Sequence, residues 1–506
     1  MDNRKLLVVL CVAGIALAAA VVIINPFGQT SRDVSFTILH TNDSHCHYND
    51  DGAAGFPTLT YLRDTYSSDD ALFIIDAGDF LQGSSYGIMT LGKASVEVMN
   101  TVGYDLTIPG NHEFDYGLDE YMTRSHELNF PTICANLVYK DTKQSVFPEY
   151  MVLEKCGVKV GFFGLLTTSV KTSTIAGSMG NTETTDPAAA AERMVKVLKD
   201  EGVDCIVAVG HLGVDDPDYM TSDEVCNQVS GIDIFIDGHS HTEMEDGKVC
   251  DGSIELLPSD TVIASTGCYM KNVGVIKYDN GNISAKLYRE KADNKDETYQ
   301  TIKRVEADVD ERLSKQVGKT EIFLNGERDA VRNEETNLGD FMTDAVLRST
   351  DSTICVLNGG LFRTSLEPGD IILKEVYDVF PFLNFVCTVD APGSAIWDMM
   401  DFSLSLMGHS NGGYLQFSGM TVTYDPQADA SHRVVSIKVD GKEIDKEATY
   451  KVVTIDFIVK GGDGNTFLSS YPSKTVGVIE PMVANYIESM GTITEGDIEG
   501  GRLVQV

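Results

Sequence analysis

The chain has 506 residues, of which 42% are apolar and 23% charged, and its formal net charge is −37 at pH 7. This composition is typical of a folded globular protein and excludes collagen-like and disordered chains, while the length predicts at least two domains. An acidic surface repels nucleic-acid polymers, so an anionic small-molecule substrate requires a local cluster of positive charge.

The N-terminal residues 1–30 have the pattern of a membrane anchor or signal segment. Arg4 and Lys5 precede an uncharged apolar run over 6–24. A helix of this length spans about 28 Å, close to the thickness of a bilayer core. The cations stay on the cytoplasmic side, which places the rest of the chain outside the cytoplasm. The small residues 18–20 also offer a cleavage site, and cleavage would leave a secreted or periplasmic protein.

Cysteine usage does not define a redox framework. The chain has ten cysteines, none with the CxxC spacing of a structural metal site. Cys11 lies in the apolar run, and the nine others cannot all pair with one another. One or two disulfides are compatible with this pattern, and the spacing does not specify which.

Two domains and a connecting helix follow the N-terminal segment. Short apolar runs alternate with amphipathic stretches such as 186–200, which predicts an α/β catalytic domain over residues 31–295. Residues 296–316 are charged and lack glycine and proline, which predicts a linking helix. Strands and glycine-rich turns then predict a second α/β domain over residues 317–506.

Polar side chains follow the predicted strands of the first domain. The candidate metal ligands at these strand ends are Asp43, His45, Asp79, Asn111, His211, His239 and His241. Because the carboxyl ends of the strands meet at one rim of an α/β sheet, we expect these side chains to converge. Imidazole, carboxylate and amide groups form the mixed donor set of first-row divalent ions. Seven ligands suit two ions that share one carboxylate, and Asp79 is the expected bridge.

The alternative for each residue alone is structural. A single histidine at a strand end is more often hydrogen-bonded within the fold, and a single aspartate there is usually a turn former or helix cap. Five such motifs in order, all at strand ends, are hard to explain by turn chemistry.

The loop PGNHEFDYG, residues 109–117, carries more titratable groups than a surface turn needs. Asn111 is the expected metal ligand of this loop. His112 leaves the loop in another direction and is free to donate to a phosphoryl oxygen or to a leaving group. Asp115 is expected to hold the other imidazole nitrogen and to favour the imidazolium form. Glu113 is expected to stabilise the loop.

These motifs resemble those of the 5′-nucleotidase family of two-domain metallophosphoesterases. ILHTNDSHCHY, DAGDFLQGS, GNHEFDYG, VGHLG and GHSH occur in the order of its N-terminal motifs. NGGLFR, FPFLNFV, YLQFSGM and DFIVKGGDGNTF resemble its C-terminal domain. The resemblance covers essentially residue 34 to the end and extends to bacterial UDP-sugar hydrolases and 2′,3′-cyclic-nucleotide phosphodiesterases. It implies an α/β fold with a metallophosphoesterase α/β/β/α sandwich and a second α/β (α+β) nucleotide-binding domain.

The resemblance also implies roles for individual residues. One metal ion would be held by Asp43, His45, Asp79 and His241, and the other by Asp79, Asn111, His211 and His239. His112 and Asp115 would form the catalytic dyad. Substrate binding would involve Arg328, Arg332, Asn358, Arg363, Phe382, Phe457 and Asp463. In this set Asn358 and Arg363 match the phosphate-binding pattern, the two phenylalanines match a base sandwich, and Asp463 matches a ligand of the ribose hydroxyls.

Purely structural roles are the alternative for several of these residues. Core packing is the commoner fate of a phenylalanine such as Phe382 or Phe457, and Arg328 and Arg332 have the spacing of a solvated helix face. Cys46 stands where the family more often has glycine, and its thiol would crowd the metal site, oxidise or act as a soft ligand.

The resulting expectation is an extracytoplasmic hydrolase that releases phosphate from 5′-nucleoside monophosphates by attack of metal-activated hydroxide, with His112 and Asp115 assisting. Its cofactors would be two divalent ions, foremost Zn²⁺, with Mn²⁺, Co²⁺ and Mg²⁺ as alternatives. Its partners would be a nucleotide and, through the N-terminal segment, a membrane, but no nucleic-acid polymer. The alternatives are 3′-nucleotides, 2′,3′-cyclic nucleotides, UDP-sugars or other nucleotide diphosphates as substrates and, from another class, a non-catalytic surface protein that binds nucleotides or metal.

Overall fold

The computed structural model describes residues 33–67, 71–170, 178–214, 216, 219–381 and 384–506. The predicted N-terminal segment, residues 1–30, and Phe382 lie outside these residues. Among the helices that the structure describes, none combines the length and the apolar character needed to cross a bilayer.

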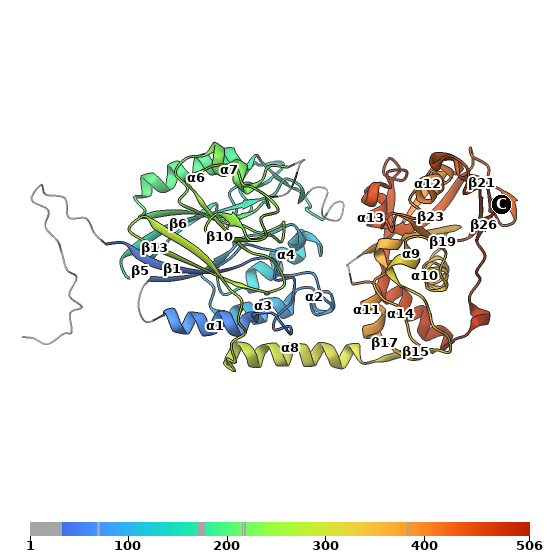
Figure 1. The fold of residues 1–506 in the computed structure, drawn as a ribbon, viewed down its shortest axis with the longest axis horizontal. Helices are drawn as coiled ribbons and strands as arrows, with labels where there is room; N and C mark the ends of the chain where they lie inside the picture. Colours follow the sequence, from blue (N-terminus) through green and yellow to red (C-terminus); the bar gives the residue numbers. More distant parts are fainter. Residues whose placement is uncertain (1–32, 68–70, 171–177, 215, 217–218, 382–383) are drawn as a thin grey trace, which may run out of the picture.

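Two mixed sheets form the centre of the first domain (Figure 1). The first has the strand order β14-β13-β1-β2-β3 and consists of β1 (Ser35–Thr41), β2 (Ala71–Asp76), β3 (Leu106–Thr107), β13 (Val273–Asp279) and β14 (Asn282–Tyr288). The second has the order β11-β10-β12-β9-β8-β6-β5 and consists of β5 (Tyr150–Lys155), β6 (Val158–Leu166), β8 (Cys205–His211), β9 (Ile234–Ile236), β10 (Glu243–Glu245), β11 (Lys248–Val249) and β12 (Val262–Thr266). Strands β1, β2 and β3 run parallel to one another, as do β6, β8 and β9, so each set ends at a common rim.

The side chains of β1 and β2 alternate between two apolar layers, as expected for a strand period of two. Phe36, Ile38 and Phe73 pack between the two sheets with residues of β6 and β8. Leu39 and Ile74 point to the opposite face and join the core beneath the helices. The helices that cover the outer faces are α1 (Gly55–Tyr66) and α3 (Lys93–Val102) on one sheet and α6 (Pro187–Glu201) and α7 (Ser222–Gln228) on the other. The arrangement is the expected α/β/β/α sandwich.

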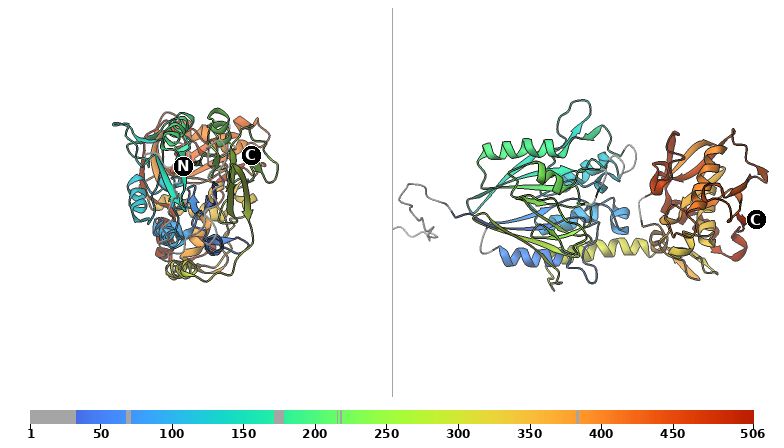
Figure 2. Two further views of the ribbon diagram at one scale, coloured as in Figure 1. Left: turned by 90° about the vertical axis from the view of Figure 1, so that its left-hand side faces the viewer. Right: turned by 45° about the horizontal axis from the view of Figure 1, so that its top comes forward.

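Helix α8 (Glu297–Leu313) connects the two domains within the segment predicted to be helical. The side chain of Asp296 caps its first turn by accepting from the backbone N–H of Tyr299. Ile302 and Val305 pack into the core of the first domain, whereas the last turn of α8 contacts the second domain through a small apolar cluster. This cluster consists of Ile88, Val309, Leu313 and Tyr377. Figures 1 and 2 show α8 running along the first domain toward the second.

The second domain surrounds one apolar core with mixed sheets and helices, which confirms the predicted α/β class. Its main sheet has the order β19-β16-β23-β18-β24 and consists of β16 (Ile354–Asn358), β18 (Phe385–Pro392), β19 (Leu415–Ser418), β23 (Thr449–Ile455) and β24 (Ser473–Val478). A three-stranded sheet consists of β15 (Gln316–Thr320), β17 (Gly369–Ile372) and β25 (Thr492–Ile493). A four-stranded sheet consists of β20 (Met420–Tyr424), β21 (Val434–Val439), β22 (Lys442–Glu443) and β26 (Leu503–Gln505). The helices are α9 (Arg328–Val331), α10 (Asn337–Arg348), α11 (Leu373–Val379), α12 (Gly393–Ser405), α13 (Asp456–Val459) and α14 (Ile479–Met490).

The described part of the chain contains nine cysteines, and all of them are free thiols. The sequence was compatible with one or two disulfides, and no disulfide forms among the described residues.

Candidate metal centre

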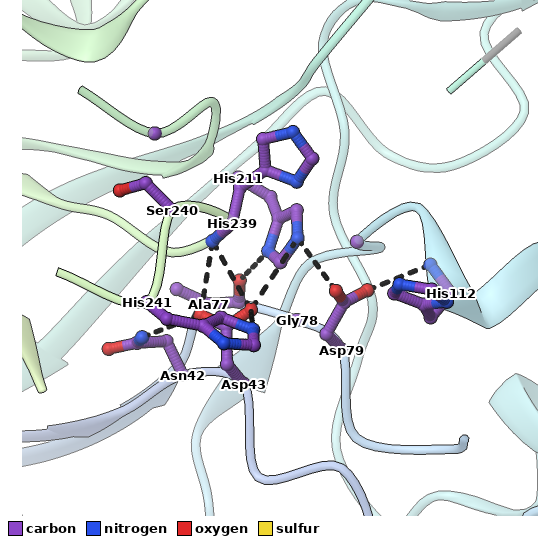
Figure 3. Close-up of polar contacts among 12 residues, drawn as sticks. Asn42, Asp43, Ala77, Gly78, Asp79, His112, His211, His239, Ser240 and His241 are labelled. Atoms are coloured by element: carbon purple, nitrogen blue, oxygen red, sulfur yellow. Dashed lines mark hydrogen bonds and ion pairs between the residues drawn. The ribbon is translucent and has the colours of Figure 1, made fainter. Parts of the chain in front are cut away.

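The strand ends of the first domain bring the predicted ligands to one rim. Asp43 and His45 follow β1, and Asp79 follows β2. His211 is the last residue of β8, and His239 follows β9. Figure 3 shows side chains from these separate segments gathered around a common point. The convergence expected from strand polarity is therefore present.

Two overlapping groups of donor atoms lie close enough to hold metal ions. The first consists of Asp43, His45 and His241, and the second of Asp43, Asp79 and His211, with the donor atoms of each group within 4.8 Å of one another. In the first group, Nε2 of His45 lies 3.1 Å from Nε2 of His241, which lies 3.4 Å from Oδ1 of Asp43. In the second, Nε2 of His211 lies 3.0 Å from Oδ2 of Asp79.

Both aspartates face both groups. Asp43 is common to the two groups. Oδ2 of Asp79 lies 3.8 Å from Nε2 of His45, in addition to its contact with His211. The sequence predicted that Asp79 lies between the two groups. It did not predict that the carboxylate of Asp43 is also common to both.

His239 lies beside the second group, and Asn111 directly precedes His112, whose backbone N–H donates to Oδ1 of Asp79. The backbone N–H of His239 donates to Oδ2 of Asp43 across 3.0 Å, and its ring centroid lies 5.2 Å from that of His211. Oδ1 of Asn111 is buried without a hydrogen-bond partner, and Nε2 of His211 faces Oδ2 of Asp79 at 3.0 Å without forming a well-directed hydrogen bond. An unsatisfied buried acceptor is costly in a purely structural role. These orphaned atoms fit a site built to hold metal.

Backbone carbonyls orient two of the imidazoles. Nδ1 of His45 donates to the carbonyl of Gln82 across 2.8 Å. Nδ1 of His211 donates to the carbonyl of Ala77 across 2.8 Å. Because a carbonyl only accepts, Nδ1 of each ring carries a proton, which leaves Nε2 directed into the donor groups as the atom available to a metal ion. This is the tautomer that a metal-binding histidine needs.

The backbone is strained at the same positions. Five of the predicted ligands have a left-handed φ, from 48° to 82°: Asp43, His45, Asp79, His239 and His241. Non-glycine residues adopt this conformation at an energetic cost, and such residues concentrate at functional sites. Close approach adds a further constraint, because a Cβ atom at Gly110 would lie 2.2 Å from Oδ1 of Asp79.

His112 and Asp115 form the expected pair at the edge of the donor groups. Nδ1 of His112 lies 2.7 Å from Oδ2 of Asp115, and its ring centroid lies 5.3 Å from that of His45. Burial lowers the pKa of His112, but the carboxylates of Asp115 and Asp79 outweigh it and raise the pKa to about 9. The imidazolium form is therefore favoured at neutral pH.

Glu113 stabilises the loop. Its buried carboxylate accepts the backbone N–H groups of four residues: Asp79, Phe80, Leu81 and Gly110. This network joins the DAGDF and GNHEF segments, so Glu113 has the expected stabilising role and also sets the position of Asp79.

The predicted role of Cys46 as a soft ligand or a source of crowding is wrong. Its Sγ atom points into the core, where it donates to the carbonyl of Phe80 at 3.4 Å and accepts from the hydroxyl of Ser95 at 3.2 Å. Burial raises the pKa of this thiol to about 12. The thiol beside the donor groups belongs to Cys268, which sequence reasoning missed. Burial lowers the pKa of His241, but hydrogen bonds to Asp43 and Cys268 raise it to about 10.

The second domain carries a cluster of three arginines. Arg328 is exposed, but Arg332 is only 8% exposed, so a solvated helix face does not describe Arg332. Nε of Arg332 is buried without a partner, and Nη1 reaches the carbonyl of Ser410 only at 3.5 Å. Burial lowers the pKa of Arg332, and the charges of Arg328 and Arg363 lower it further. Such crowding of cations suits an anion site.

Polar and aromatic groups lie beside these arginines. Nδ2 of Asn358 donates to Oδ2 of Asp463 across 2.9 Å, while Oδ1 of Asn358 is buried without a partner. Phe457 is 41% exposed, so the core-packing alternative is wrong for this ring. A Cβ atom at Gly462 would lie 2.4 Å from the ring of Phe457, which places the ring directly over that glycine.

Charges of the second domain act on the rim of the first. Burial raises the pKa of Asp115, and the charge of Lys460 opposes this rise. Burial likewise raises the pKa of Tyr269, and the charge of Arg363 opposes it. Lys460 and Arg363 of the second domain are therefore within electrostatic range of Asp115 and Tyr269 at the rim of the first domain.

Two family models match the chain. Residues 36–243 match calcineurin-like phosphoesterase, and residues 316–470 match the C-terminal domain of 5′-nucleotidase. The chain is 28% identical to the trifunctional nucleotide phosphoesterase protein YfkN of Bacillus subtilis, over 92% of this chain and 34% of that protein, so it spans about a third of this relative. It is 26% identical to a 5′-nucleotidase of Vibrio cholerae, over 92% of each chain.

A solved structure is also similar. The crystal structure of a 5′-nucleotidase precursor from Thermus thermophilus matches with a TM-score of 0.65 and 25% identity, over 94% of this chain and 99% of that one.

Proposed function

Because the chain belongs to the metallophosphoesterases that join a calcineurin-like phosphoesterase domain to a 5′-nucleotidase C-terminal domain, we propose that it releases inorganic phosphate from 5′-nucleoside monophosphates outside the cytoplasm. The observation that carries this proposal is the pair of donor groups at one rim of the first domain, with the hydrogen-bonded His112 and Asp115 at their edge. The proposed location rests on the apolar N-terminal run.

Two divalent ions fit the donor groups. Asp43, His45, Asp79 and His241 would hold one, and Asp79, Asn111, His211 and His239 would hold the other. When bound, such ions polarise a phosphoryl oxygen and make water a nucleophile at neutral pH. The imidazole-rich donor set favours Zn²⁺, with Mn²⁺, Co²⁺ and Mg²⁺ as alternatives.

His112 supplies the proton-bearing group of the reaction. Its raised pKa keeps the ring charged at neutral pH, and Asp115 orients it through Nδ1. Nε2–H is then free to donate to a phosphoryl oxygen or to the departing nucleoside oxygen. This intact pair argues against a protein that only binds nucleotides, because binding alone does not need it.

The second domain recognises the nucleotide. The guanidinium groups of Arg328, Arg332 and Arg363 donate to phosphate oxygens, and the Nδ2 amide group of Asn358, which is oriented by its hydrogen bond to Asp463, is the further donor. Phe457 stacks on the base, with Phe382 as its proposed counterpart, and Asp463 accepts from the ribose hydroxyls. Base stacking on an aromatic ring is worth about 1–3 kcal/mol and tolerates any base.

A substrate panel tests the proposal. The full chain, loaded with Zn²⁺, is assayed with AMP, 3′-AMP, 2′,3′-cyclic AMP, ADP and UDP-glucose, with and without a chelator. Phosphate release from AMP that stops on chelation supports the proposal. Preference for a cyclic nucleotide or a UDP-sugar would move the chain to the alternative substrates that its motifs leave open. Binding without turnover of any substrate would make it a non-catalytic protein.

A further inference from the structure

Tyr269 lies beside the donor groups on a loop that none of the motifs covers. The loop follows β12 and includes Gly267, Cys268, Tyr269 and Met270. Tyr269 and Met270 have φ angles of 59° and 52°, in the left-handed region that bulky residues avoid. Five of the predicted ligands have the same strain, and Tyr269 shares it although it is not a predicted ligand. Strain of this kind points to a residue whose position matters for function.

The ring of Tyr269 contacts both imidazoles of the first donor group. Its centroid lies 5.6 Å from that of His45 and 5.5 Å from that of His241, the latter in an edge-to-face arrangement at 72°. The backbone N–H of Tyr269 donates to the carbonyl of Asp43 across 2.8 Å. One residue therefore contacts all three members of that group.

The ring of Tyr269 also contacts two residues outside the donor groups. The ring of His47 packs against it with centroids 4.6 Å apart, and Nζ of Lys271 lies 5.8 Å from its centroid. These contacts, together with the left-handed backbone, leave the phenol ring little freedom to move.

In the first donor group, the imidazole of His241 is the ring whose orientation is least constrained. The side chain of His241 is 35% exposed, whereas that of His45 is 6% exposed and that of His211 is fully buried. Nδ1 of both His45 and His211 is fixed by a backbone carbonyl. His241 is hydrogen-bonded instead to the carboxylate of Asp43, itself a donor group, and to the thiol of Cys268, which is a weak hydrogen-bonding group. Its orientation depends more strongly on packing.

We propose that Tyr269 is a positioning residue, whose ring holds the imidazoles of His45 and His241 so that both Nε2 atoms face one metal ion. This inference rests on the proposed metal-dependent function and adds to it a residue that acts through the ligands. It assigns the ring, not the hydroxyl, as the functional part of Tyr269.

Metal titration tests the inference without relying on activity. The full chain is stripped of metal and titrated with Zn²⁺ in competition with a chromogenic chelator. Tyr269→Asn removes the ring and keeps a residue that tolerates the left-handed backbone. Tyr269→Gly does the same without adding a donor atom, and Tyr269→Phe retains the ring. Tyr278→Asn is the matched control, because Tyr278 stacks on Phe36 at 4.7 Å, away from the donor groups.

The inference predicts that Tyr269→Asn and Tyr269→Gly weaken the binding of one of two Zn²⁺ ions by about 10- to 100-fold. Tyr269→Phe and Tyr278→Asn should bind both ions like the wild type. At saturating Zn²⁺ the kcat for AMP should recover, because the ring acts only through the ligands. Unchanged Zn²⁺ affinity in both ring-deleted variants, or a kcat that stays low at saturating Zn²⁺, would overturn the inference. A wild-type chain that binds no Zn²⁺ would instead refute the proposed function, and this inference with it.

Discussion

The backbone N–H of His112 donates to Oδ1 of Asp79 across 2.8 Å, while Oδ2 of the same carboxylate lies 3.0 Å from Nε2 of His211. A single side chain thus joins the loop that carries the proposed proton donor to the donor groups for metal. The distance from His112 to the donor groups is consequently set by the fold before any substrate arrives, which is the preorganisation that the proposed catalysis requires.

Removal of the His112 imidazole should reduce turnover far more than substrate affinity. We expect His112→Gln to lower kcat for AMP by about 10²- to 10⁴-fold with little change in KM, because general acid catalysis acts in the transition state. Steady-state kinetics at saturating metal provide the measurement. Asp115→Asn should give a smaller loss, since it removes the orienting partner but keeps the ring. A rise in KM without loss of kcat would assign His112 to binding alone.

We expect Arg332 to lower the stability of the folded protein and to increase its affinity for AMP. Its guanidinium is buried beside two like charges and has an unpartnered Nε atom. Arg332→Met keeps much of the side-chain volume and removes the charge, so we expect a higher Tm together with a KM for AMP raised by about 10- to 100-fold. Thermal unfolding and kinetics on the same preparation measure both effects. A variant with lower Tm and unchanged KM would show that Arg332 has a structural role.

Phe457 should matter only for substrates that carry a base. Phe457→Ala removes an exposed ring, so folding should be unaffected, while the loss of about 1–3 kcal/mol of stacking should weaken AMP binding by about 5- to 150-fold. Ribose 5-phosphate, which lacks a base, serves as the control substrate. If both substrates lose affinity equally, Phe457 acts on something other than the base.

Glu480 should make the stability of the protein depend on pH. It is fully buried, both of its carboxylate oxygens lack hydrogen-bond partners, and burial raises its pKa from 4.5 to about 8. The folded state therefore keeps a proton that the unfolded chain releases, and the contribution to stability falls as the pH rises from about 4.5 to about 8. Glu480→Gln removes this dependence. We expect the Tm of the variant to rise relative to the wild type between pH 5 and pH 8, and parallel Tm curves would contradict this assignment.

The convergence of the proposed metal ligands could be predicted because strand polarity constrains their positions. Asp43, Asp79 and His211 each follow an apolar run, and parallel strands bring such residues to one rim. The direction in which a side chain points within the loop after a strand could not be predicted from the sequence. Cys46 is adjacent to His45, yet its left-handed backbone turns the thiol into the core, and no local pattern signals that turn.

Other features depend on contacts between distant segments. Tyr269 reaches His45 across more than two hundred residues of sequence, and no motif marks the loop on which it lies. The four backbone donors of Glu113 come from two separate loops. In the second domain, Phe457 lies over Gly462 and is exposed, whereas the residue type alone favours a packed ring.

The metal content of the active protein is the most direct test of this account. Purified full-length chain, loaded with Zn²⁺ and freed of excess, should contain about two ions per chain by elemental analysis. Anomalous diffraction should place them at the two donor groups, and chelation should abolish phosphate release from AMP. A chain that hydrolyses AMP while holding no metal at Asp43, Asp79 and His211 would contradict the account.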